Sequence, residues 1–142
     1  MLSRSPAETE AAGRAFAGRL KPGDVVALEG TLGSGKTKFV AGVCAGLGAE
    51  GHVVSPTFTL INEYPAPFGI VAHVDMYRIG GKREIAELGL EEYFTDHCIC
   101  LIEWPDALGD ILPPVHYTIR FAHGEKETER EIRFVEPAEV PR

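Results

Sequence analysis

The chain has 142 residues, of which 44% are hydrophobic and 25% charged, which is the composition of an ordinary globular protein large enough to bury a core. Its net charge is −7, from 21 acidic and 14 basic side chains. Proteins that hold DNA or RNA with their own surface are usually basic, so direct nucleic-acid binding is not expected. No apolar run approaches the roughly 20 residues of a membrane span. We expect one compact domain over residues 1–142, with 136–142 as a flexible tail.

The cysteines and the N-terminus favour a cytoplasmic protein. Cys44, Cys98 and Cys100 lack metal-ligand spacing and are expected to be reduced, half-buried thiols. Residues 1–10 lack the basic-then-apolar layout of a signal peptide.

A first helix is predicted from Pro6, because Ser5 and Glu8 stand in the positions of a capping box. Its apolar stripe consists of Ala12, Phe16 and Leu20. A helix placed before a loop-bearing strand can pack beside a nucleotide base or against the sheet. The spacing favours the sheet.

The most informative stretch is G-T-L-G-S-G-K-T at 30–37, which matches the phosphate-binding pattern G-x-x-x-x-G-K-[ST] without a mismatch. A short buried strand is predicted over 25–28, and a helix over 38–47 that ends at Gly48. Strand, loop and helix therefore follow in the order that a phosphate loop requires, with the helix N-terminus facing the phosphates.

The residue types of this loop suit a magnesium nucleotide. Its glycines let successive backbone N–H groups point at phosphate oxygens. Lys36 is expected to reach the β- and γ-phosphates and the Thr37 hydroxyl to hold Mg²⁺. The residues expected to line the nucleotide here are Leu32, Gly33, Ser34, Gly35, Lys36, Thr37 and Lys38.

Two acidic residues close apolar strands further along the chain. The run 70–74 leads into Asp75, and the run 98–102 leads into Glu103. The carboxyl ends of strands in an open α/β sheet are where ligands bind, so both acids are candidates for one crevice. Either could hold Mg²⁺ directly or through water, with the other orienting the attacking water. The alternative for each is a surface acid at a strand end.

Other polar residues near these strands leave two interpretations open. Ser55 and Thr57 either contact Mg²⁺ or the γ-phosphate, as in switch-type loops, or order a turn. Trp104 follows Glu103 and is either core or a nucleotide contact. His73 is interpreted as a satisfied core or rim histidine, and Arg78 as a site arginine or a salt-bridge partner.

The remaining elements complete an α/β fold of the P-loop NTPase type, with a mostly parallel sheet flanked by helices and an antiparallel hairpin at the C-terminal edge. The predicted segments are strands at 52–54, 59–64, 69–75 and 98–104, a turn at 65–69, helical pieces at 82–88 and 90–94, a connector at 112–114 and a hairpin from 116–123 and 130–135. In that hairpin Tyr117, Ile119 and Phe121 share one face, matched by Ile132 and Phe134.

Several stretches together resemble one family. They are the loop at 30–37, S-P-T-F-T-L at 55–60, H-V-D-M-Y-R at 73–78, E-L-G-L-E-E-Y at 87–93 and I-E-W-P at 102–105. In this order they closely resemble the small bacterial ATPases called TsaE, of the tRNA threonylcarbamoyladenosine biosynthesis machinery. The likeness extends from the helix that contains Thr9 to about Pro113.

The resemblance implies a P-loop α/β fold, Mg-ATP as ligand, and slow ATP hydrolysis. It also implies a complex with TsaB and TsaD, which transfer the threonylcarbamoyl group to adenosine 37 of tRNA while the TsaE-like ATPase resets the complex between turnovers. Contact with tRNA would then be at most indirect, and no role on DNA or membranes is implied.

By the same resemblance, individual residues take roles. Lys36 and Thr37 match the family's phosphate and metal residues, and Asp75 and Glu103 its essential acids, which with Lys36 make the expected catalytic set. Trp104 matches a tryptophan near the nucleotide. Thr9 falls where the family's N-terminal segment approaches the adenine.

The chain departs from the usual family loop, G-D-L-G-A-G-K-T, at two positions. Ser34 in place of Ala is small and is expected to be harmless. Thr31 in place of Asp removes a charge close to the phosphates, and is expected to change metal affinity or rate without abolishing binding.

Three other functions compete with the ATPase. A small-molecule kinase usually closes a lid of several arginines over the phosphate, whereas only Arg78 and Arg83 lie between the loop and the last core strand. A GTPase commonly reads guanine with N-K-x-D, whereas the single asparagine, Asn62, precedes Glu63 and Tyr64. A non-hydrolysing, nucleotide-gated adaptor remains open.

Overall fold

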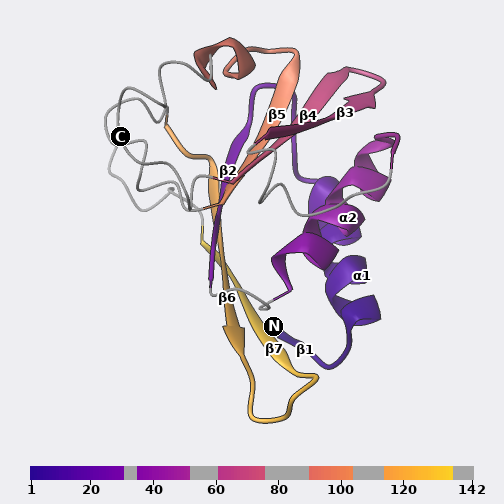
Figure 1. The fold of residues 1–142 in the computed structure, drawn as a ribbon, viewed down its shortest axis with the longest axis vertical. Coiled ribbons are helices and arrows are strands. Elements are labelled where there is room, and N and C mark those ends of the chain that lie inside the picture. Colours follow the sequence, from indigo (N-terminus) through magenta and orange to yellow (C-terminus); the bar gives the residue numbers. More distant parts are fainter. Residues whose placement is uncertain (31–34, 52–60, 76–89, 104–113, 136–142) are drawn as a thin grey trace.

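The computed structural model describes residues 1–30, 35–51, 61–75, 90–103 and 114–135. They form one seven-stranded sheet with strand order β1-β7-β6-β2-β5-β4-β3 (Figure 1). The strands are β1 (Leu2–Ser3), β2 (Val25–Glu29), β3 (Ile61–Ala66), β4 (Gly69–Asp75), β5 (Cys98–Glu103), β6 (Tyr117–His123) and β7 (Arg130–Val135). The helices are α1 (Pro6–Ala17), α2 (Lys36–Leu47) and the short 3₁₀ helix η1 (Leu90–Tyr93).

The middle of the sheet is parallel and its two edges are antiparallel. Strand β2 pairs in parallel with β5 and with β6, and β5 pairs in parallel with β4. Antiparallel pairs are β3 with β4, β6 with β7, and β1 with β7. The predicted fold class is therefore confirmed. The carboxyl ends of β2, β4 and β5 meet at one edge of the sheet, where α/β proteins bind ligands.

The predicted C-terminal hairpin is present, but it does not form the edge of the sheet. Strand β1, which sequence analysis did not predict, pairs with the outer side of β7. The backbone of Met1 exchanges two hydrogen bonds with Ile132, since the Met1 ammonium donates to the Ile132 carbonyl and the Ile132 N–H donates to the Met1 carbonyl. The two residues of β1 thus cover part of an edge that would otherwise be open.

Both α1 and α2 lie on the same face of the sheet (Figure 1). The N-cap of α1 is Ser5, as predicted, and its Oγ accepts from the Glu8 N–H at 3.1 Å. The Glu8 carboxylate in turn accepts a hydrogen bond from the Arg4 N–H, one residue before the cap. Helix α2 begins at Lys36, two residues earlier than predicted, because Gly35 takes a positive φ of 99° and can act as its N-cap.

Two glycines let the helices touch without side chains between them. A Cβ on Gly42 of α2 would lie 1.9 Å from the Glu10 carbonyl oxygen of α1, and one on Gly13 of α1 would lie 2.2 Å from the Phe39 carbonyl oxygen of α2. Neither position has room for a methyl group. This close contact packs the middle of α1 directly against α2.

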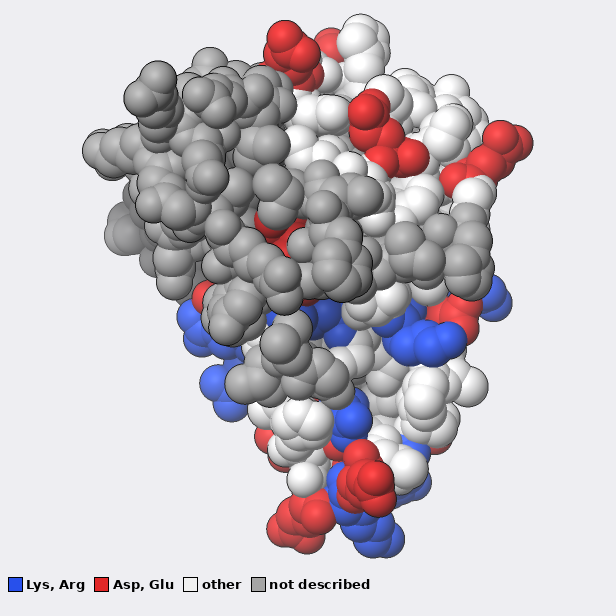
Figure 2. All heavy atoms as spheres, viewed as in Figure 1, with Lys and Arg blue, Asp and Glu red and all other residues white. Residues whose placement is uncertain are grey.

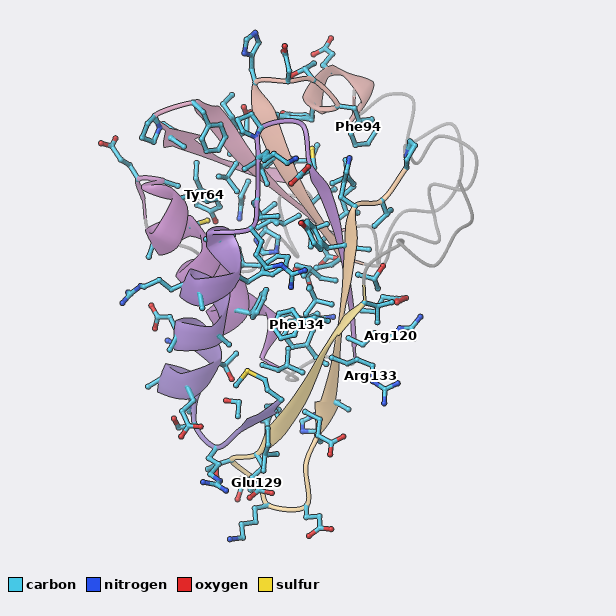
Figure 3. All side chains as sticks on the ribbon, turned by 180° about the vertical axis from the view of Figure 1, so that it is seen from behind. Tyr64, Phe94, Arg120, Glu129, Arg133 and Phe134 are labelled. Carbon is cyan, nitrogen blue, oxygen red and sulfur yellow. The ribbon has the colours of Figure 1, made fainter. Side chains whose placement is uncertain are left out.

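The main core lies between the helices and the sheet. It includes Phe16, whose ring meets Tyr117 edge-on at 5.1 Å between centroids. Ala12 and Leu20 pack against the same cluster, so the apolar stripe of α1 packs on the sheet, as its spacing indicated. Ile119, Phe121 and Ile132 are buried in this core, with Tyr117 and Phe134 beside it, which confirms the predicted faces of the hairpin. Figure 3 shows Phe134 pointing towards the helices, and Arg120 and Arg133 pointing away from them.

A second cluster covers the other face of β2, β4 and β5, where Tyr93 and Phe94 pack beside buried Cys98 and Cys100. All three cysteines are free and fully buried rather than half-buried. Burial raises the pKa of the Cys44 thiol to about 12, which makes that thiol unreactive.

Some predicted boundaries need correction, and others lie outside the described residues. The β3–β4 connection is two residues, not five, because Pro65 and Ala66 still pair with Ile70 and Gly69. The helical piece at 90–94 is the 3₁₀ helix η1. The predicted segments 52–54, 82–88, 112–113 and 136–142 lie outside the described residues. No helix in the described part of the chain has the length and apolarity to cross a membrane.

Candidate functional site

The predicted phosphate loop joins the central strand β2 to α2. Strand β2 lies between β5 and β6, so its carboxyl end opens at the middle of the sheet. Of the predicted nucleotide-lining residues, Gly35, Lys36, Thr37 and Lys38 form the N-cap and first turn of α2. The others in the loop, Leu32, Gly33 and Ser34, lie outside the described residues.

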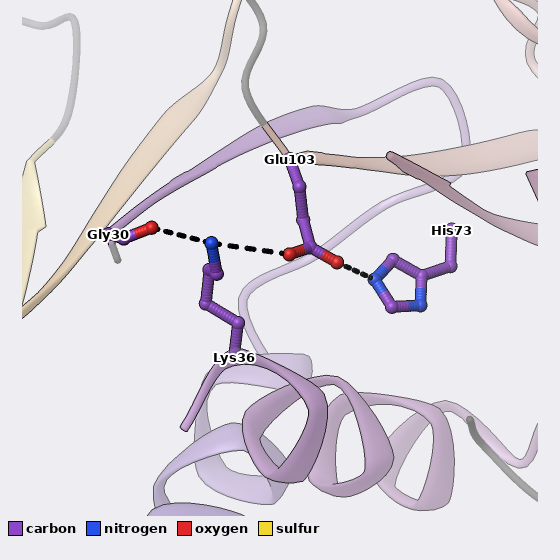
Figure 4. Close-up of polar contacts among 4 residues, drawn as sticks. All are labelled: Gly30, Lys36, His73 and Glu103. Atoms are coloured by element: carbon purple, nitrogen blue, oxygen red, sulfur yellow. Dashed lines mark hydrogen bonds and ion pairs between the residues drawn. The ribbon is translucent and has the colours of Figure 1, made fainter. Parts of the chain in front are cut away.

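Lys36 is the buried cation of the site. Its side chain is 4% exposed, and its ammonium donates to the Gly30 carbonyl oxygen at 2.6 Å (Figure 4). The same Nζ lies 3.4 Å from Oε1 of Glu103. Lys36 therefore connects the beginning of the loop sequence to the end of β5, across the space in front of β2.

The two predicted acids stand side by side. Asp75 is the last residue of β4 and Glu103 the last of β5, and the parallel register places them directly opposite each other. Both are almost completely buried, at 4% and 5% exposure. The sequence predicted that these two acids, each at the end of an apolar strand, face one crevice. The register places Asp75 next to Glu103, whose carboxylate lies 3.4 Å from the Lys36 ammonium.

The neighbours of Glu103 keep its carboxyl group ionised. Burial alone would raise the pKa of its carboxyl group. The hydrogen bond and charge of His73, followed by the charge and hydrogen bond of Lys36, outweigh burial and leave that pKa below its ordinary value. Glu103 is therefore an ionised, buried carboxylate at neutral pH, with one oxygen towards Lys36 and the other towards His73.

His73 is a residue whose role sequence analysis missed. It is fully buried, as the interpretation of a core histidine required, but Nε2 lies 2.7 Å from Oε2 of Glu103 (Figure 4). The H-x-D spacing carried a signal for this, because residues 73 and 75 point to the same face of a strand. The contact with Glu103 also requires the β4–β5 register, which the sequence does not give.

Thr9 and Arg130 lie against the beginning of α2. A Cβ on Gly35 would lie 3.5 Å from the Thr9 methyl carbon and 3.8 Å from Cγ of Arg130. Thr9 is 1% exposed, and its hydroxyl lies 2.7 Å from that of Ser3. Sequence analysis missed Arg130, which reaches this corner because β1 pairs Ser3 with it.

The oxygen donors of the site suit magnesium better than a softer metal. Among the described residues, no group of three or more His, Cys, Asp or Glu side chains could enclose a metal ion. Mg²⁺ is usually held by one or two carboxylates together with water and substrate phosphates. Asp75, Glu103 and the Thr37 hydroxyl offer such a donor set. The other predicted contacts, Thr57 and Trp104, lie outside the described residues, as do Ser55 and Arg78.

On the face in Figure 2, the basic side chains of the described residues are mixed with acidic ones and form no continuous basic surface.

The fold and the site together define an α/β protein of the P-loop NTPase type. The middle of the sheet is parallel, and the phosphate-loop sequence connects its central strand to a helix that begins at a buried lysine.

Comparison with known proteins identifies the family. The family model described as threonylcarbamoyl adenosine biosynthesis protein TsaE matches residues 3–132. The tRNA threonylcarbamoyladenosine biosynthesis protein TsaE of Bacillus subtilis is 42% identical over 92% of this chain and 80% of its own length. The protein of that name from Treponema pallidum is 35% identical over 89% of this chain and 95% of its own length. The crystal structure of Bacillus subtilis YdiB superimposes with a TM-score of 0.77 at 38% identity, over 94% of this chain and 82% of that one.

The chain belongs to the TsaE family, whose members take part in threonylcarbamoyladenosine biosynthesis. The resemblance drawn from the sequence motifs is thereby confirmed.

Proposed function

We propose that this chain binds Mg-ATP at the beginning of α2 and hydrolyses it as an accessory subunit of a TsaB–TsaD complex that modifies adenosine 37 of tRNA. The observation that carries the proposal is the buried Lys36 ammonium at the loop-to-helix junction, 3.4 Å from Glu103. Two adjacent strands end in carboxylates at that point. A cation at a helix N-terminus favours a polyphosphate, and neighbouring carboxylates favour its metal.

Binding of the phosphates would fall mainly to Lys36 and the loop amides. The Gly30 carbonyl, which accepts a hydrogen bond from Lys36, holds the ammonium in its buried position. Phosphate oxygens are stronger acceptors than a carbonyl, so Lys36 can exchange one for the other without leaving its buried position. The positive end of the α2 dipole adds to this attraction.

Hydrolysis would depend on the two carboxylates. Thr37, Asp75 and Glu103 are the residues that would hold Mg²⁺, directly or through water. The metal, when bound, neutralises charge on the phosphates as the γ-phosphoryl group leaves. The acid that does not hold the metal would accept a hydrogen bond from the attacking water and orient it.

The nucleoside would lie near the corner formed by α1 and β7. Thr9 and Arg130 flank Gly35 there. The family resemblance adds Trp104 to the nucleotide contacts, and the position of Thr57 in a switch-type loop adds that residue. We propose ATP rather than GTP as the ligand, since the chain lacks the N-K-x-D motif of guanine readers.

The pathway follows from the family and its named relatives, which are tRNA threonylcarbamoyladenosine biosynthesis proteins. We assign the transfer itself to TsaB and TsaD, and to this chain the ATP-driven reset of the complex between turnovers. The net charge of −7 supports indirect rather than direct contact with tRNA. The proposed location is the cytoplasm.

Two measurements test the proposal together. Isothermal titration gives the affinity for Mg-ATP, and ADP and inorganic phosphate are counted for the isolated chain and for the chain with TsaB and TsaD at equal ATP. Equal amounts of ADP and phosphate, released faster in the complex, support an ATPase. ADP without free phosphate would indicate a kinase. Tight binding without turnover in the complex would indicate a nucleotide-gated adaptor.

A further inference from the structure

The side chain of His73 makes a single polar contact among the described residues. It lies on β4, two residues before Asp75 and on the same face of the strand. Its side chain is 0% exposed, and Nε2 lies 2.7 Å from Oε2 of Glu103. Nδ1 is buried and has no hydrogen-bond partner among the described residues.

The chemistry of the two groups fixes the direction of this hydrogen bond. An ionised carboxylate can only accept, so Nε2 must carry the proton and donate it to Oε2. In either protonation state of the ring, Nδ1 is then a buried polar atom without a hydrogen-bond partner among the described residues. Leaving such a group unsatisfied lowers the stability of a folded protein.

Space filling does not explain a histidine at this position. Val71 precedes it on the same face of β4, and Leu101 is opposite it in the register with β5; both are completely buried. An apolar side chain could occupy this place without an orphaned nitrogen. The polar feature that the imidazole serves is the carboxylate of Glu103.

With Oε2 bound to His73, the carboxylate of Glu103 is restricted to one orientation. Oε1 then faces the Lys36 ammonium at 3.4 Å and the end of the strand, where Asp75 also lies. Without the histidine, the carboxylate could rotate and pair either oxygen with Lys36. Residues that orient the carboxylates of a metal or phosphoryl-transfer site in this way change activity without touching the substrate.

We propose that His73 is a positioning residue: its Nε2–H holds Oε2 of Glu103, so that Oε1 is presented to the nucleotide and its metal or attacking water. This inference rests on the function proposed above and deepens it by giving one residue of the sheet a role in hydrolysis. It predicts that the side chain is needed for turnover and much less for nucleotide affinity.

Two amide substitutions of His73 distinguish the effect of losing the hydrogen bond from the effects of altered polarity or folding. The side-chain nitrogen of Gln extends about as far as Nε2 of His, whereas that of Asn reaches only the Nδ1 position. His73→Gln can therefore donate to Glu103, and His73→Asn cannot, although both are uncharged and polar. Loss of a residue that orients a ligating side chain typically costs about 10–100-fold in activity.

The experiment measures kcat and KM for ATP in the assembled complex with TsaB and TsaD. His73→Asn is expected to lower kcat by about 10–100-fold with KM within about threefold of wild type, and His73→Gln to restore most of the loss. Equal kcat values for the two variants, whether normal or reduced, would overturn the inference. Wild type without turnover in the complex would instead overturn the proposed function, and the role of His73 with it.

A spectroscopic measurement needs no variant and is unaffected if a substitution fails to fold. Imidazole ¹⁵N–¹H correlation spectra of the wild-type chain report which ring nitrogen carries the proton. The positioning role requires the proton on Nε2 of His73. A neutral ring protonated on Nδ1 alone could not donate to Glu103 and would exclude the role, whatever the kinetics of the variants.

Discussion

Replacing Lys36 with methionine tests the site at its buried cation. Lys36→Met keeps an unbranched side chain of similar length and removes the ammonium that now contacts Gly30 and Glu103. A hydrogen bond to a charged group contributes about 1.5–3 kcal/mol. Loss of one such bond to the phosphates would weaken Mg-ATP binding by about 10–150-fold, and a second bond would remove tight binding altogether.

The same substitution should lower stability, because Glu103 loses its cation while staying buried. Breaking a buried pair by removing one partner costs about 3–5 kcal/mol at most. The 3.4 Å separation is longer than a strong charge-assisted bond, and His73 still holds the other oxygen. We therefore expect a smaller loss of stability, about 1–3 kcal/mol.

Isothermal titration measures the affinity for Mg-ATP, and urea unfolding measures the free energy of unfolding. Lys21→Met is the matched control, because it makes the same charge change at an exposed residue before the amino end of β2. It should leave both quantities close to wild type. A folded Lys36→Met variant that binds Mg-ATP within about threefold of wild type would refute the assignment of the phosphate site.

Four further predictions follow from the same geometry. Asp75→Ala and Glu103→Ala should lose hydrolysis far more than nucleotide affinity, since Lys36 and the loop amides provide most of the binding; normal turnover of either variant in the assembled complex would show that this residue has no role in hydrolysis. ATP should outcompete GTP in a displacement assay, and equal affinities would contradict the proposed base preference. Mg-ATP should change the emission of Trp104, the only tryptophan; a flat titration at saturating ATP would remove it from the site. The pKa of Glu103 is lowered in the folded chain, so its contribution to stability is complete above the ordinary carboxyl pKa of about 4.3 and is lost as the pH falls through the lower folded value. The difference in unfolding free energy between wild type and Glu103→Gln should accordingly shrink on acidification, and a difference that grows would contradict the assigned shift.

The sequence predicted the parts of the fold that depend on local patterns. The 30–37 motif lies between β2 and α2 as its spacing required, and period-two alternation identified the inner faces of β6 and β7. The cap of α1 was also predicted, because the residues that form it are close in sequence. These signals come from residues a few positions apart, so the chain itself carries them.

What the sequence did not predict depends on register and on backbone contact. The bond between His73 and Glu103 joins residues 30 positions apart and exists only in one alignment of β4 with β5. Arg130 reaches Gly35 because a two-residue strand at the N-terminus pairs with β7. Such pairings are decided by tertiary packing. A strand of two residues is too short to show a periodic pattern in the sequence.

The central claim, that ATP hydrolysis by this chain resets a tRNA-modifying complex, is tested most directly by counting modified tRNA per complex over time. TsaB, TsaD, tRNA and the threonylcarbamoyl donor are combined with this chain and either ATP or a non-hydrolysable analogue. We predict continued formation of threonylcarbamoyladenosine with ATP, and an arrest after the first turnover with the analogue or with Glu103→Ala. Continued turnover with the analogue, at a rate equal to that with ATP, would contradict the account.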